Sequence, residues 1–262
     1  MKVRQATEKD YGTFARLFPE LRTPDRVISE ERWLREHLRT TLVAEREGRD
    51  VGIAFYQALD GVGFLRMIMT DPTARRAGVG RALMTDVRLR LESAGCSEWV
   101  LNVLPDNAAA IALYESFGFR PVYRSRAVFL PWKTLDGLPR PPSRAREITP
   151  ADDARVEKTA KIVPGLVADL RARNDRVLRM IEGDGAEVAA CALFDPSFPG
   201  AYPFWARTPE LAVALLHDLR PYKQPIHEHL SCVLADQPDI ADALVAMGGE
   251  QRLETMHMRG PL

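Results

Sequence analysis

Two short segments in the first half of the sequence combine residue types that could do chemistry. The first runs from Arg75 to Arg81 and reads RRAGVGR, with two glycines and three arginines. Glycines let a ligand approach the backbone closely, and a helix start offers free N–H groups and partial positive charge. The segment therefore predicts a pyrophosphate site, to which Arg75, Arg76 and Arg81 could add charged contacts. Three solvated arginines on an ordinary turn would give the same pattern.

The second segment runs from Asn107 to Phe119 and reads NAAAIALYESFGF. A phenol, with a reference pKa of about 10, can protonate a departing thiolate, whose reference pKa is about 8.5. Tyr114 is therefore a candidate acid for a reaction in which a thiol leaves. Asn107 lies about two helical turns earlier, so one long ligand could contact both side chains. The alternatives are a tyrosine ring packed between helices and an asparagine that only caps its helix.

The residues around both segments predict four elements in order. The evidence is the alternation of apolar residues in strands and their recurrence every four positions in helices. Proline and glycine set the ends, because proline has no N–H and glycine suits the end of a helix. The elements are a strand from Phe64 to Thr70, a helix from Val79 that ends at Ala94 and Gly95, a strand from Glu98 to Leu104, and a helix capped by Asp106 or Asn107.

The composition is typical of a globular protein with a hydrophobic core. The 262 residues are 46% hydrophobic. No apolar run approaches the roughly 18 residues of a membrane span, and the charged N-terminus is unlike a secretion signal. We therefore expect a cytoplasmic protein with no membrane partner. The sequence has 22 basic and 18 acidic residues up to residue 140, and 14 and 18 after it. This distribution suits a polyanionic cofactor and provides no basic stripe for nucleic acid.

No metal site is expected from the histidines and cysteines. His227 and His229 would share one face of a strand, but no third ligand lies at a recognisable spacing. Cys96, Cys191 and Cys232 are far apart and form no C-x-x-C pair. We therefore interpret the cysteines as core thiols rather than as disulfide or zinc ligands.

The chain divides into two related halves. The stretch 131–144 is rich in proline, so it can continue neither a helix nor a central strand. We predict a linker there, between domains formed by residues 1–130 and 145–262. Both halves begin with a short strand and a helix capped by threonine, and their last parts align without a gap. The aligned segments are Val3 to Asp10 with Ala145 to Asp152, and Val103 to Gly118 with Val233 to Gly248.

The second half lacks the residues that could do chemistry. Where the glycine segment should recur, Trp205 to Leu211 contains no glycine, and Leu244 stands at the position of Tyr114. We therefore expect a second domain that retains the fold without a cofactor site.

Together these features resemble the GNAT superfamily of acyl-CoA-dependent N-acetyltransferases, and Asn107 to Phe119 is similar to its ribosomal-protein alanine N-acetyltransferase branch. The resemblance implies an α/β fold with an α+β mixed sheet, in two tandem GNAT-like domains, each a mostly antiparallel sheet flanked by helices. It also implies acetyl-CoA as cosubstrate and Tyr114 as the catalytic acid. The implied cofactor-binding positions are Ile68, Met69, Thr70, Arg75, Arg76, Ala77, Gly78, Val79, Gly80, Arg81, Asn102 and Asn107.

The sequence departs from that branch at Asn102, where the branch carries a glutamate. An amide cannot take up the amine's proton. Either water carries that proton away and the amine reaches the site in its neutral form, or a carboxylate elsewhere acts as the base. Glu30, Glu31 and Asp60 are the candidates. The expected activity is acetyl transfer to an amine by direct attack in a ternary complex. The acceptor would be a small molecule or a peptide, and the protein a monomer or homodimer. The alternative is a non-catalytic acyl-CoA-binding sensor or scaffold.

Overall fold

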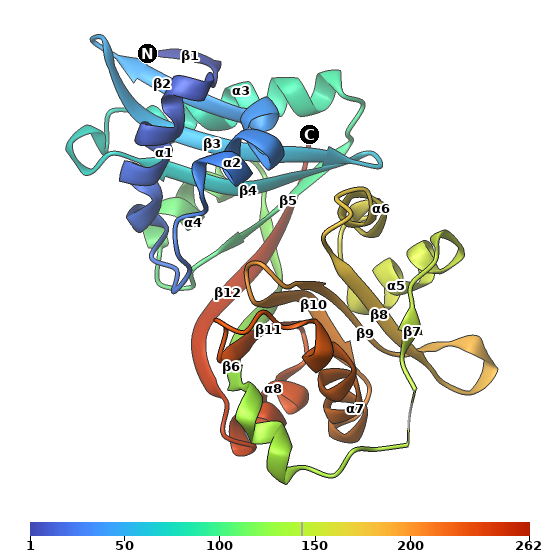
Figure 1. The fold of residues 1–262 in the computed structure, drawn as a ribbon. Coiled ribbons are helices and arrows are strands. Elements are labelled where there is room, and N and C mark those ends of the chain that lie inside the picture. The colour runs from blue at the N-terminus through green and yellow to red at the C-terminus, as the bar shows by residue number, and fades with distance from the viewer. Residues whose placement is uncertain (143) are drawn as a thin grey trace. The chain divides into compact units, whose positions relative to one another are not determined.

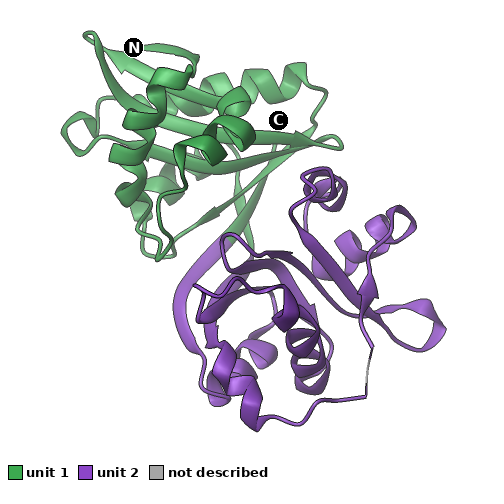
Figure 2. Cartoon of the chain, in the orientation of Figure 1, with its two compact units in different colours: residues 1–122, 257–262 green, residues 123–256 purple. Residues whose placement is uncertain are grey.

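The computed structural model describes residues 1–142 and 144–262, which form two compact units (Figure 2). Unit 1 contains residues 1–122 and 257–262, and unit 2 contains residues 123–256. The chain therefore leaves unit 1, forms unit 2 and returns to unit 1 with its last residues. Among the described residues, no helix combines the length and the apolar content that crossing a bilayer requires.

Unit 1 is built on a mixed sheet with the strand order β1-β2-β3-β4-β5-β12. Strands β1 to β4 pair antiparallel, whereas β4 and β5 run parallel. Helices α1 and α2 cover one face of the sheet and α3 covers the other (Figure 1). The strands are β1 (Lys2–Gln5), β2 (Thr41–Arg46), β3 (Arg49–Leu59), β4 (Val62–Thr70), β5 (Glu98–Val103) and the end of β12 (Glu250–Pro261). The helices are α1 (Tyr11–Leu17), α2 (Glu30–Glu36), α3 (Val79–Ser93) and α4 (Ala108–Glu115), with 3₁₀ turns η1 (Glu8–Asp10), η2 (Phe18–Leu21), η3 (Leu38–Thr40) and η4 (Pro72–Ala74).

Two strand glycines let α3 pack directly on this sheet. A Cβ atom at Gly52 would lie 2.5 Å from Val79 Cγ1, and one at Gly63 would lie 2.4 Å from Leu91 Cδ1. Both distances are shorter than van der Waals contact, so glycine is the residue that fits. The opposite face of β3 packs against α1 and α2 through a buried apolar cluster that includes Ile53. The start of α3 is therefore held against β3.

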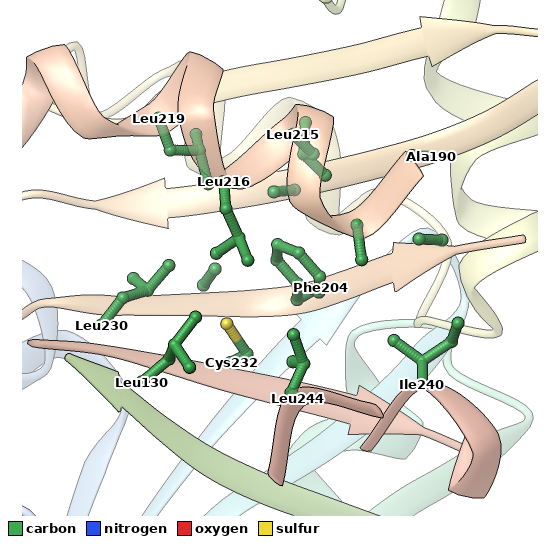
Figure 3. Packing of buried hydrophobic residues seen from close by; sticks show 14 of the residues in the cluster. Leu130, Ala190, Phe204, Leu215, Leu216, Leu219, Leu230, Cys232, Ile240 and Leu244 are labelled. Atoms are coloured by element: carbon green, nitrogen blue, oxygen red, sulfur yellow. The ribbon is translucent and has the colours of Figure 1, made fainter. Parts of the chain in front are cut away.

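Unit 2 repeats this plan with the strand order β12-β6-β11-β10-β9-β8-β7, in which β10 and β11 are parallel. The pairs β6–β11, β9–β10, β8–β9 and β7–β8 are antiparallel. Apolar side chains of α7 and α8 pack against β10 and β11 to form its core (Figure 3). The strands are β6 (Arg120–Pro131), β7 (Arg146–Glu147), β8 (Val177–Glu182), β9 (Val188–Asp195), β10 (Gly200–Ala206) and β11 (His229–Ala235). The helices are α5 (Asp153–Ala160), α6 (Leu166–Arg171), α7 (Pro209–Leu219) and α8 (Pro238–Ala246), with 3₁₀ turns η5 (Trp132–Gly137), η6 (Pro150–Asp152), η7 (Asp184–Ala186) and η8 (Arg220–Tyr222).

Both units begin with the same arrangement of side chains. In each, an arginine of the first strand donates to both carboxylate oxygens of an aspartate, and that aspartate forms a capping box with a threonine. The N–O distances are 2.8 and 2.9 Å in unit 1 and 2.7 and 2.9 Å in unit 2. Such bidentate pairs fix the angle between strand and helix. The residues are Arg4, Thr7 and Asp10 in unit 1, and Arg146, Thr149 and Asp152 in unit 2.

The division of the chain differs from the predicted domain boundaries. We expected a linker over 131–144, but Pro131 ends β6, and Trp132 is buried in the core of unit 2. Residue 143 of that predicted linker lies outside the described residues. The physical reason is the sheet of unit 1, which takes its last strand from residues 257–262. The chain therefore passes between units within β6 and β12, and the prolines do not mark the boundary.

Candidate active site

Strands β4 and β5 separate partway along their length (Figure 1). They pair over the first four residues of each strand, although β4 continues to Thr70. The register between β3 and β4 shifts between Leu65 and Met67, which leaves Arg66 as one additional residue. Such a bulge bends a strand and increases its twist. From Arg66 to Thr70, the edge of β4 that faces β5 is therefore paired with no described strand.

The turn after β4 is ordered by a carboxylate. Asp71 accepts hydrogen bonds from the Thr73 amide at 2.9 Å and from the Thr73 hydroxyl at 2.7 Å, and it forms an ion pair with Arg16. These donors lower the pKa of Asp71 to about 2, so its charge is present throughout the physiological range. Arg76 and Gly78 then adopt left-handed backbone angles, with φ of 65° and 80°. Such a turn reverses the chain into the start of α3.

The first turn of α3 presents backbone N–H groups. Helix geometry leaves the amides of Val79, Gly80 and Arg81 without an acceptor inside the helix, and Ala82 makes the first bond, to Gly78 O at 3.0 Å. These donors add to the partial positive charge at the helix start, which favours an anion. No described atom lies within 4 Å of the Cβ position of Gly78. The space beside this residue is therefore open to a ligand.

The second glycine of the segment brings α3 close to α4. A Cβ atom at Gly80 would lie 3.0 Å from Leu113 Cδ2 of α4. Asn107 caps α4 through Oδ1, which accepts from the Ala110 amide at 3.2 Å. The capping role of Asn107 is therefore present, and its Nδ2 group is the part that could bind a ligand. The contact between Gly80 and Leu113 shows that α4, the helix that carries Tyr114, packs against the first turn of α3.

The ring of Tyr114 is buried, with 4% of the residue exposed. It lies 6.0 Å from the ring of Phe119, which lies 4.7 Å from Trp99 of β5. The hydroxyl makes no hydrogen bond within residues 1–142 and 144–262, although buried tyrosines usually have such a partner. Burial raises the pKa of Tyr114 well above its usual value of about 10, so the phenol holds its proton at neutral pH. Tyr114 thus packs as a core residue and also offers a proton donor without a protein acceptor.

Two of the three arginines of the glycine segment contact other side chains. Arg75 forms an ion pair with Glu20, and Arg81 donates to Ser116 Oγ at 3.0 Å. All three arginines are exposed, and Arg76 occupies the left-handed turn. The backbone of the segment, rather than these side chains, is therefore the preformed part of the site.

Asn102, the position at which a glutamate was missing, faces a histidine that we did not predict. Asn102 is the first residue of β5 beyond the part that pairs with β4, and its side chain is exposed. Asn102 Oδ1 lies 3.0 Å from Nδ1 of His257 in β12. Burial, assisted by the charge of Arg259, lowers the pKa of His257 to about 4. The two positions are 155 residues apart in the sequence, and no local signal predicts their contact, because only the returning strand creates it.

The carboxylates named as candidate bases are placed unevenly. Asp60 lies in the turn between β3 and β4, and about 13 Å of strand, from Val62 to Arg66 at about 3.3 Å per residue, separates this turn from the bulge. Glu30 and Glu31 lie in the exposed first turn of α2. Asp25, which we did not name, lies between η2 and α2, and desolvation raises its pKa. Asp25 is exposed, like Glu30 and Glu31.

In unit 2, a side chain of the protein occupies the corresponding place. Strands β10 and β11 pair over two residues and then separate, as β4 and β5 do. Gln237, which aligns with Asn107, donates from Nε2 to Ala206 O at 2.7 Å and accepts at Oε1 from Ala206 N at 3.3 Å. Leu244, which aligns with Tyr114, lies in the buried core (Figure 3). The end of β10 is thus hydrogen-bonded internally, and unit 2 has no phenol at the matching position.

Comparison with known proteins finds a family match over most of unit 1 and a shared fold over the whole chain. Residues 5–119 match the model of the acetyltransferase (GNAT) family. Over 74 residues, the chain is 40% identical to the ribosomal protein bS18 alanine N-acetyltransferase of Escherichia coli K12, which corresponds to 28% of this chain and 50% of that protein. The chain therefore spans about half the length of this curated relative.

Several solved structures resemble the chain over nearly its whole length, and two of them serve as examples. The GCN5-related N-acetyltransferase from Sphaerobacter thermophilus matches with a TM-score of 0.68 and 16% identity, over 99% of this chain and 95% of that one. The GCN5-related N-acetyltransferase from Kribbella flavida matches with a TM-score of 0.54 and 15% identity, over 98% and 71%. These matches confirm the tandem fold, including the second unit.

Proposed function

Because residues 5–119 match the model of the acetyltransferase (GNAT) family, we propose that this protein transfers the acetyl group of acetyl-CoA to an amine. The observation that carries this proposal is the arrangement of three features in unit 1. The unpaired edge of β4 leads into the N–H groups at the start of α3, and the phenol of Tyr114 lies on the adjacent helix. A diphosphate joined by an amide-containing arm to a thioester requires these three features.

The residues present fit this cosubstrate. The backbone N–H groups of 76–81 would bind its pyrophosphate, because they include donors without an intrahelical acceptor next to open space. The edge of 68–70 would pair with the amides of the pantetheine arm, as a strand pairs with a strand. Asn107 Nδ2 would donate to the same arm, and Asn102 would lie near its thioester end. Arg75 and Arg81 would reach the phosphates only by leaving their present partners.

The chemistry of this chain's residues follows from their protonation. When bound, acetyl-CoA supplies an acetyl group activated as a thioester. Tyr114 would donate its Oη proton to the departing sulfur, and its raised pKa keeps that proton available until negative charge develops. The amine nitrogen bonds to the acetyl carbon, the carbon–sulfur bond breaks, and the amine's proton passes to water. Water then reprotonates the phenolate, which balances the reaction.

We assign the cosubstrate to unit 1 alone. In unit 2, the Gln237 amide makes two hydrogen bonds to the backbone of Ala206, the same kind of bonds that a pantetheine amide would make. The helix that follows β10 begins at Pro209 and has Thr208 as its cap, without a glycine turn before it. For acetyl-CoA to bind in unit 2, the hydrogen bonds between Gln237 and Ala206 would have to break, and the described residues of unit 1 form no equivalent bonds at the end of β4.

Titration calorimetry and a thiol-release assay test the proposal. Acetyl-CoA should bind with one site per chain, and an absence of heat with folded protein would remove the cofactor assignment. Release of CoA thiol should then depend on an amine, tested with a peptide beginning with alanine, with a lysine derivative and with small diamines. Binding without amine-dependent release from any of them would favour a sensor or scaffold, because Asn102 replaces the expected glutamate.

A further inference from the structure

We propose that Asn102 and His257 form a pair that positions the acceptor amine for attack, in place of a carboxylate that would deprotonate it. The inference rests on the proposed acetyl transfer, because it concerns the acceptor side of the same site. It predicts that the acceptor must enter as a free amine.

The pair forms where the end of the chain returns to unit 1. Leu262 N donates to Ser97 O at 3.1 Å, and His257 Nδ1 lies 3.0 Å from Asn102 Oδ1. Asn102 is five residues after Ser97, and His257 is five residues before Leu262, so both contacts fit one antiparallel register of β5 and β12. His257 is 4% exposed, whereas Asn102 is exposed. The amide is therefore the member of the pair that a substrate can reach.

Burial and neighbouring charges fix the protons of this pair. Arg259 lies on the same strand as His257, and it is ion-paired with Glu98 of β5 at 3.4 Å. Arg120 is the charged residue that β6, on the other side of β12, contributes to unit 1. Burial, with the charge of Arg259, lowers the pKa of His257 to about 4, so the ring is neutral near pH 7.

The neutral ring sets the direction of the hydrogen bond. An amide oxygen has no proton to donate, so His257 Nδ1–H must be the donor and Asn102 Oδ1 the acceptor. A carbonyl-type oxygen has a second lone pair, which can accept an N–H from an incoming amine. His257 thereby holds Oδ1 in place, and Asn102 orients the amine without changing its charge.

This arrangement determines the pH dependence of the reaction. An amide cannot store the amine's proton, so only the free amine is productive. Below the pKa of the acceptor, kcat/KM should therefore fall about tenfold per pH unit, and the midpoint should belong to the substrate. If Asp25 or another carboxylate acted as base, the midpoint would belong to the protein and would be the same for every acceptor.

Two acceptors of different basicity separate these cases. The probes are a peptide with an N-terminal alanine, whose amine has a pKa of about 7.8, and Nα-acetyl-lysine amide, whose amine has a pKa of about 10.4. We expect the acidic limb of kcat/KM to move by about 2.6 pH units between them. Coincident limbs would overturn the proposal. If one probe alone is acetylated, the midpoint of the acidic limb of kcat/KM should lie at the pKa of that probe's amine. A midpoint below about pH 6 would contradict the proposal.

Substitutions distinguish positioning from a structural role. Asn102→Ala should lower kcat/KM about tenfold, as expected for the loss of one hydrogen bond, with the limb unchanged. Asn102→Glu should move the limb to lower pH, because a carboxylate can take the proton. His257→Leu should resemble Asn102→Ala, whereas His257→Asn, whose amide nitrogen can take the place of Nδ1, should retain most activity. Met258→Leu, on the same strand, is the control.

A spectroscopic measurement tests the pair without any acceptor. Nitrogen-15 NMR of the imidazole ring should show His257 protonated at Nδ1 in the natural protein, and this signal should shift in Asn102→Leu. A ring protonated only at Nε2, or one insensitive to residue 102, would refute the pairing. Acetyl-CoA affinity, measured by calorimetry, should be the same in the two His257 variants and in Met258→Leu as in the natural protein. If the natural protein does not bind acetyl-CoA, the proposed function is refuted. The NMR measurement would still decide whether His257 donates to Asn102.

Discussion

Replacing Tyr114 with phenylalanine should separate turnover from stability. The hydroxyl makes no hydrogen bond to a described residue, and the ring contact with Phe119 at 6.0 Å does not depend on it. An unsatisfied polar group in buried surroundings costs about 1–3 kcal/mol when it is fully enclosed. We therefore expect the free energy of unfolding of Tyr114→Phe to be unchanged or to rise by up to about 1 kcal/mol. Turnover should fall about 10²- to 10⁴-fold, the contribution of a positioned acid, which corresponds to about 3–5 kcal/mol of activation free energy.

Urea unfolding, calorimetry and amine-dependent thiol release measure the three quantities independently. Acetyl-CoA affinity should change less than about threefold, because the phenol acts on the departing sulfur rather than on the bound ground state. Tyr11→Phe is the matched control for stability, since the Tyr11 hydroxyl donates to Ile28 O at 2.9 Å. Its loss should cost about 0.5–1.5 kcal/mol. The reasoning is refuted if Tyr114→Phe keeps turnover within threefold of the natural protein, or if it loses as much stability as Tyr11→Phe.

Four further substitutions, one of them a control, test the loop, the turn and the second unit. Gly78→Ala forces a side chain into φ 80° at a cost of about 1 kcal/mol and should raise the acetyl-CoA Kd about tenfold by calorimetry. Gly95→Ala, also at φ 80°, should cost similar stability without changing that Kd. The pKa of Asp71 is lowered to about 2, so its ionised carboxylate stabilises the fold above about pH 4, and this contribution is lost as the pH falls toward 2. In Asp71→Asn, the free energy of unfolding measured in urea should therefore depend less on pH between about 4 and 2. Gln237→Ala should lower the free energy of unfolding by about 1–3 kcal/mol, because Ala206 loses both partners, and calorimetry should show no second acetyl-CoA site.

The parts of the site that follow from local sequence were predictable. The strand expected from Phe64 to Thr70 is β4, the helix expected from Val79 is α3, and the strand expected from Glu98 is β5, each with an end within two residues of the prediction. Apolar spacing places these elements, and proline or glycine ends them. Asn107 was one of two expected caps, and it is the residue that caps α4.

The parts that depend on long-range strand pairing were not predictable from a single sequence. Residues 131–144 were a reasonable domain boundary, because proline disfavours regular structure. Trp132 is nevertheless buried in the core of unit 2, so the start of this stretch is part of that unit. No residue near position 257 signals that β12 ends in the sheet of unit 1, since its alternating residues would suit either unit. The contact between Asn102 and His257 is therefore visible only in the structure. The same holds for Gln237, because hydrogen bonds to a backbone leave no trace in residue spacing.

The returning strand makes the candidate site of unit 1 depend on unit 2, to which we assign no cosubstrate. Residues 257–262 border β5 and supply His257, and they follow all of unit 2 along the chain. A chain that ended at residue 122 would leave β5 as an open sheet edge and would remove the partner of Asn102. Under the proposed function, acetyl transfer in unit 1 would therefore depend on the folding of unit 2. Unit 2 has Leu244 where unit 1 has the phenol and Thr208 as the helix cap in place of a glycine turn, while its core remains buried.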